Sequence, residues 1–236
     1  MHRIKQIMAK ETKDRTEEQL EAFEQTLTKT EKYIEENRNS LMIIVLAIVL
    51  IFGGYYAYSG LYLKPKATKA QTAMFGAENY FKNDSFELAL NGDSERDIAG
   101  FIEIIEEFGN TPAGNVANYY AGISFLRMGE FEEALTYLSN YSTDSKILEP
   151  MAKGAMGDAN AELGNNEEAL NLYIQAASSN TNDFTSPIYL MKAGNLCEVM
   201  GNTDAAIAHY ENLMDNYKNS TEGRQAEKLL ARLGKF

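Results

Sequence analysis

The chain has 236 residues with 34 acidic and 22 basic side chains, so its formal net charge at pH 7 is −12. This balance argues against nucleic-acid binding, because affinity for phosphate backbones comes mostly from clustered Lys and Arg. The single cysteine, Cys197, excludes an internal disulfide and a multi-cysteine metal site, and the two histidines, His2 and His209, lie far apart in the sequence. We therefore expect no metal site and no cofactor.

Residues 1–39 form a segment that precedes the most apolar part of the chain, and residues 16–38 have a helical pattern. Thr16 and Gln19 have the spacing of a capping box. Four apolar residues follow at spacings of three, four and seven, namely Leu20, Phe23, Leu27 and Ile34. The pattern predicts an amphipathic helix that docks on a partner or lies on a membrane surface. The alternative is a solvated helix that leads into the next segment.

Residues 40–63 contain no charged side chain, and about 20 such residues suffice to cross the hydrocarbon core of a bilayer. A cleaved signal peptide does not fit, because the apolar run is too long and starts too far from the N-terminus. A buried helix of a soluble protein rarely runs this long without a polar face. The run therefore predicts a transmembrane signal anchor. Its second half holds four tyrosines expected at the membrane interface: Tyr55, Tyr56, Tyr58 and Tyr62.

The basic residues around the predicted span do not decide its orientation. Lys29, Lys32 and Arg38 precede it, whereas four lysines follow it. These four are Lys64, Lys66, Lys69 and Lys82. The positive-inside rule is thus undecided, or leans slightly towards the C-terminal side, although long domains translocate despite such charges.

Residues 64–236 carry an internal repeat. Two glycines and an alanine recur three times with internal spacings of seven and five residues. Successive sets are 35 and then 37 residues apart. The sets are Gly122, Gly129 and Ala134; Gly157, Gly164 and Ala169; and Gly194, Gly201 and Ala206.

These sets resemble the tetratricopeptide repeat, a helix–turn–helix unit with a period of 34 residues. The first glycine of a set is expected inside the first helix where the second comes close, and the second glycine in the turn. The alanine faces back across the pair. One helical turn later, Leu138, Tyr173 and Tyr210 are expected to fill the groove towards the next repeat. The large aromatic residue expected early in each first helix is replaced by Asn118, Lys153 and Leu190.

The fold predicted for the chain is all-α, with one transmembrane helix followed by a tetratricopeptide-like α-solenoid. Four repeats are expected, at about 66–111, 115–148, 150–183 and 187–220. Residues 221–236 form a capping helix that shields the last repeat. The first repeat is the weakest, with a first helix at 66–82 and a polar loop at 83–95. A non-repetitive helical bundle is the alternative.

Little in the sequence points to catalysis. Carboxylates occur in close groups on predicted helices, at Glu103/Glu106/Glu107, Glu132/Glu133 and Glu167/Glu168. Solvated helix faces explain them, and acids also suit helix N-termini. The sequence has neither a phosphate-binding loop nor a nucleophile elbow. Cys197 is expected to pack as a small apolar residue, and His209 to lie on the surface or in a groove. We expect a protein that is not an enzyme; hydrolysis by Glu132 and Glu133 is the alternative.

The layout resembles the ancillary subunit family of the bacterial SecYEG translocon, most clearly in EENRNSLMIIVLAIVLIFGGYYAYSGLYL followed by KATKAQTAMFGAENYF. The resemblance implies a single-pass protein of the bacterial inner membrane with a cytoplasmic N-terminus and periplasmic repeats. It implies two partners, the SecYEG translocon and a membrane-anchored periplasmic chaperone of the prolyl-isomerase type. The expected role is a scaffold that passes exported chains to chaperones, without a small-molecule substrate. The alternative is an anchored adaptor for another envelope-assembly or secretion complex.

Overall fold

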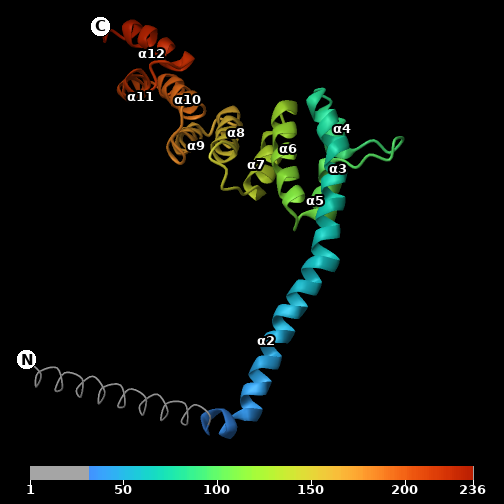
Figure 1. The fold of residues 1–236 in the computed structure, drawn as a ribbon. Helices are drawn as coiled ribbons and strands as arrows, with labels where there is room; N and C mark the ends of the chain where they lie inside the picture. The colour runs from blue at the N-terminus through green and yellow to red at the C-terminus, as the bar shows by residue number, and fades with distance from the viewer. Residues whose placement is uncertain (1–31, 236) are drawn as a thin grey trace, which may run out of the picture. The chain divides into compact units, whose positions relative to one another are not determined.

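The computed structural model describes residues 32–235 (Figure 1). Within this range every regular element is helical, and the only strand-like pairing is an isolated bridge between Asp93 and Ile98. The all-α class predicted from the sequence is therefore confirmed. The chain divides after Tyr62 into two compact units, which are described separately.

The first unit contains α2, Arg38–Tyr58, followed directly by a π-helical turn, η1, Ser59–Leu63. Residues 32–36 are also helical. The rest of the amphipathic helix predicted over 16–38 lies outside the described residues, as do Leu20, Phe23 and Leu27 of its apolar stripe.

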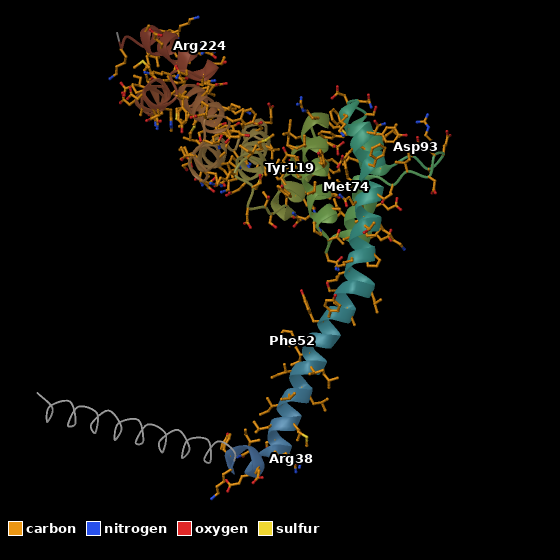
Figure 2. All side chains as sticks on the ribbon, viewed as in Figure 1. Arg38, Phe52, Met74, Asp93, Tyr119 and Arg224 are labelled. Carbon is orange, nitrogen blue, oxygen red and sulfur yellow. The ribbon has the colours of Figure 1, made fainter. Side chains whose placement is uncertain are left out.

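One helical stretch in the described part of the chain, Arg38–Lys82, is long and apolar enough to cross a membrane by length and composition. The apolar side chains along α2 are exposed, and Phe52, labelled in Figure 2, is 69% exposed. A row of exposed apolar side chains is unfavourable in water and is typical of a surface that meets lipid or another protein. The four tyrosines of the predicted interface belt are exposed as well, and the rings of Tyr58 and Tyr62 stack with their centroids 5.3 Å apart.

The second unit is a succession of helices in which each packs on the next (Figure 1). The predicted first repeat contains α3, Lys64–Lys82, α4, Phe86–Asn91, and α5, Phe101–Phe108. The next three are pairs: α6, Pro112–Met128, with α7, Phe131–Asn140; α8, Leu148–Glu162, with α9, Asn166–Ser178; and α10, Ser186–Val199, with α11, Thr203–Asn216. The chain then forms α12, Thr221–Arg232. This order of helices is tetratricopeptide-like, as the sequence predicts.

The region 83–95 differs from the polar loop predicted there, because it contains the short helix α4. Ala89 and Leu90 of this helix are buried against α3 and α6. The apolar residues of FELAL thus reach the core, and their burial outweighs the polar character of the flanking residues. The loop after α4 is held by Asp93, labelled in Figure 2, which accepts a hydrogen bond from the hydroxyl of Tyr80.

The first glycine of each sequence set lies buried in α6, α8 or α10. A Cβ atom on Gly122 would lie 2.5 Å from Cγ of Leu138, and one on Gly157 would lie 2.6 Å from Cε1 of Tyr173. A Cβ atom on Gly194 would meet the ring of Tyr210 closer still. Any larger residue at these positions must displace a side chain of the second helix.

Leu138, Tyr173 and Tyr210 therefore cover the glycines of their own repeats. Because glycine has no Cβ atom, the first helix leaves space at each of these positions, and the leucine or tyrosine side chain of the second helix occupies that space. The alanines of the three sets are fully buried. The second glycines, Gly129, Gly164 and Gly201, have φ values of 84°, 79° and 75° at the ends of the first helices. Glycine adopts this left-handed conformation without the steric cost that other residues meet.

Buried side chains form two clusters along the second unit. One includes Phe101 and Ile104 among α3 to α8, and the other includes Tyr210 and Leu213 among α9 to α12. On α12, Gly223, Ala226 and Leu230 are buried, while four charged residues of this helix, Arg224, Glu227, Lys228 and Arg232, are exposed. The one-sided burial of α12 is what a capping helix requires.

The fold predicts that residue 157 tolerates no large side chain. Gly157→Leu should lower the free energy of unfolding by about 1–3 kcal/mol, because the new side chain collides with the ring of Tyr173. Adding Tyr173→Ala should recover part of this loss by removing the ring. The matched control is Glu162→Leu, an exposed position on the same helix, which should change the free energy by no more than about 0.5 kcal/mol. Urea unfolding of the full chain in detergent measures all four proteins, and a Gly157→Leu protein as stable as its parent would contradict this packing.

Candidate interaction groove

A groove of about 880 Å³ lies between α6 and α8 and extends to α10. The first helices of the repeats supply most of its lining, and twelve of the sixteen lining residues are uncharged. Six of these twelve are aromatic, including four tyrosines: Tyr119, Tyr120, Tyr173 and Tyr189. We call this feature the tyrosine groove.

Packing between rings holds the tyrosines of α6 in place. The ring of Tyr120 stacks on Phe101 of α5 at a centroid distance of 5.3 Å and meets Phe81 of α3 edge-on at 5.0 Å. Tyr119, labelled in Figure 2, lies 5.2 Å from Tyr141 between ring centroids. Such contacts contribute about 0.5–1.5 kcal/mol beyond the area buried. The groove therefore presents rings whose positions are set by the core.

Tyr189 enters the groove from α10 and lies on a glycine that the sequence sets do not include. A Cβ atom on Gly154 of α8 would overlap the ring of Tyr189. This close approach connects the third repeat to the fourth. The sequence analysis missed Gly154, although its position one turn before Gly157, in the same helix, is a visible signal.

The hydroxyl groups of the groove differ in their partners. The Tyr173 hydroxyl donates a hydrogen bond of 2.7 Å to Oδ1 of Asp158. Among residues 32–235, the hydroxyls of Tyr119, Tyr120 and Tyr189 form no side-chain hydrogen bond. Burial raises the pKa of all four tyrosines, and Asp158 raises the pKa of Tyr173 and Tyr189 further. These phenols are neutral at physiological pH, so each hydroxyl can both donate and accept a hydrogen bond.

Two bases and two acids line the groove, namely Arg127 and Lys192 with Asp158 and Glu162, so their formal charges sum to zero. Nζ of Lys192 lies 2.5 and 2.7 Å from the two carboxylate oxygens of Asp158 and 5.6 Å from the centre of the Tyr173 ring. Asp158 therefore joins the second helix of its own repeat to the first helix of the next.

A similar arrangement joins the fourth repeat to the capping helix. The Tyr210 hydroxyl donates to Oε1 of Glu198 at 2.6 Å, and Nη2 of Arg232 donates to the same carboxylate. Lys192 follows Asp158 by 34 residues, and Arg232 follows Glu198 by 34 residues. The sequence analysis missed both contacts, although an acid and a base one repeat apart are a usable signal. We call these two arrangements the acid–tyrosine–base contacts.

The carboxylates first considered for catalysis lie on three different helices. The carboxylates of Glu103, Glu132/Glu133 and Glu167/Glu168 are exposed in the first turns of α5, α7 and α9. Residues 32–235 contain no group of three or more His, Cys, Asp or Glu side chains arranged to hold a metal ion. Cys197 is fully buried in α10, and burial lowers the pKa of His209 on α11.

Comparison with known proteins supports the repeat assignment. The tetratricopeptide repeat family matches residues 189–220, which begin at Tyr189 in α10 and include all of α11. No curated protein matches the chain. The chain thus carries a tetratricopeptide repeat, a unit typical of non-enzymatic scaffolds for protein–protein interaction.

The buried tyrosines of the groove predict a loss of stability in alkali. Their pKa values are raised in the folded protein, so above about pH 10 the unfolded chain ionises while the folded chain keeps its protons. The contribution of these tyrosines to the free energy of unfolding is therefore fully present below about pH 10 and falls as the pH rises above it. Tyr189→Phe should reduce the fall in unfolding free energy between pH 8 and pH 10.5 by about 1 kcal/mol. Urea unfolding at the two pH values measures the difference, and an equal fall in variant and parent would contradict the assignment.

Proposed function

We propose that the chain is a membrane-anchored, non-enzymatic scaffold of the Sec translocon that links exported chains to periplasmic chaperones. The observation that carries the proposal is the tyrosine groove, a largely uncharged aromatic surface within repeats that follow directly on an apolar helical stretch. An apolar groove with a few convergent polar groups is a general feature of binding sites. The resemblance of the layout to the translocon's ancillary subunit supplies the identity of the partners.

The proposed layout has three parts. Residues 1–39 are cytoplasmic, residues 40–63 form the signal anchor in the bacterial inner membrane, and residues 64–236 form the periplasmic repeat domain. The interface belt of the anchor is Tyr55, Tyr56, Tyr58 and Tyr62. The three Gly–Gly–Ala sets hold the helix pairs of the repeats together.

The partners proposed are the SecYEG translocon and a membrane-anchored chaperone of the prolyl-isomerase type. In this arrangement the anchor keeps the repeats close to the membrane, and the tyrosine groove receives a segment of the exported chain. Linking two binding events through one anchored molecule raises the effective concentration of the second partner. The chaperone then meets the exported chain while it is still bound.

The proposal predicts which proteins accompany the full chain when it is purified from digitonin-solubilised membranes through a C-terminal tag. Translocon subunits, the chaperone and exported chains should be enriched over an untagged strain in quantitative mass spectrometry. Ile123→Lys places a charge in the groove and should lower the recovery of exported chains. Val199→Lys is the matched control, because Val199 is 77% exposed and lies outside the groove.

Two results would contradict the proposal. If translocon subunits and the chaperone are both missing from the purified material, the scaffold does not act at the export channel. If a different stable set of envelope proteins is enriched instead, the chain is an adaptor for another complex.

A further inference from the structure

We propose that the tyrosine groove binds a peptide segment with an uncharged apolar centre and Lys or Arg in its flank, an inference that rests on the proposed function of this groove. The occupant follows from three properties of the lining and its rim: cancelled charge, free phenolic hydroxyls and a rim of carboxylates.

The first property is the cancelled charge of the groove. Lys192 is held by both carboxylate oxygens of Asp158, so its charge is not available to a ligand. Arg127 is the other base in the lining, and its formal charge is offset by that of Glu162, which also lines the groove. A carboxylate ligand would therefore find no pair of free cations, and burying it without one is costly. The centre of the bound segment must be uncharged.

The second property is the set of free hydroxyls on rigid rings. Tyr119, Tyr120 and Tyr189 come from two first helices, and within the described residues their hydroxyls make no side-chain hydrogen bond. An extended peptide brings backbone N–H and C=O groups that need partners when they leave water. A phenolic hydroxyl serves either group, while the ring face packs against an apolar side chain. The lining thus suits the backbone and the side chains of an apolar segment together.

The third property is the acidic rim. Five more exposed carboxylates lie close in sequence to the lining residues Phe131 and Glu162, where α6 and α8 end and the second helices begin. These carboxylates are Glu130, Glu132, Glu133, Glu167 and Glu168. None of them forms an ion pair within residues 32–235. Apart from Arg127, this rim carries no basic residue. A Lys or Arg that follows the apolar centre of a ligand would meet opposite charge there.

The test measures peptide binding to the full chain in lipid nanodiscs by fluorescence anisotropy. Three labelled peptides of equal length are compared. The first has an apolar centre with Lys flanks, the second has the same centre with Glu flanks, and the third has a Gly–Ser centre with Lys flanks. We expect the first to bind about tenfold more tightly than either of the others.

Substitutions in the groove and on its rim separate the two parts of the proposal. Met151→Glu places a charge in the partly buried lining and should weaken binding of the first peptide about tenfold, whereas Val199→Glu, outside the groove, should leave it unchanged. The exposed pair Glu132→Gln and Glu133→Gln does not touch the core. It should weaken the Lys-flanked peptide and flatten the salt dependence of its binding.

Several outcomes would overturn the proposal. They are equal or tighter binding of the Glu-flanked peptide, equal binding of the Gly–Ser peptide, and unchanged binding by the Met151→Glu protein. If no peptide binds while the translocon and the chaperone still co-purify with the chain, this inference fails and the proposed function stands. If the chain prefers the Lys-flanked apolar peptide but neither the translocon nor the chaperone co-purifies with it from solubilised membranes, the proposed function fails and the ligand class stands.

Discussion

The repeat domain depends on the close approach of two helices at a residue without a side chain. At Gly122, Gly157 and Gly194 the second helix places a leucine or tyrosine side chain where a Cβ atom would stand. This contact sets how closely the two helices of each pair approach. Tyr189 of α10 packs on Gly154 of α8 in the same way, and this contact lies between two helix pairs. Glycine in a helix costs about 1 kcal/mol relative to alanine, and the packing of these side chains offsets that cost.

The same side chains that close the helix pairs also shape the groove. Tyr173 covers Gly157, lines the groove and donates to Asp158, which in turn holds Lys192 of the next repeat. In the third and fourth repeats, the residues that pack the helices together therefore also line the groove. The second repeat has Ile123 and Leu138 at the positions equivalent to Asp158 and Tyr173, so it lacks the acid–tyrosine hydrogen bond of the third repeat. The formal charges of the groove lining sum to zero, whereas the residues where α6 and α8 end carry an excess of carboxylates.

Much of the fold could be predicted because its signals are local. A glycine, a turn glycine and an alanine at fixed spacing mark one helix pair, and the first and last helices follow from their apolar faces. Helix α4 was missed because it is short and because its burial depends on packing against α3 and against α6, which begins only at Pro112. The acid–tyrosine–base contacts were missed because each joins three helices, and no spacing within one helix reveals them. The sequence predicts that the repeats form a groove but not which residues line it, because the lining depends on which faces of α6, α8 and α10 remain uncovered.

In the proposed function, an apolar anchor holds the tyrosine groove on the outer side of the membrane, where exported chains emerge. Protease accessibility in spheroplasts of cells that produce the full chain with a different tag at each end measures this topology directly. We expect the C-terminal tag and the repeat domain to be digested while the N-terminal tag is protected. A protected repeat domain would contradict the proposed topology and would make the protein a membrane-tethered adaptor in the cytoplasm.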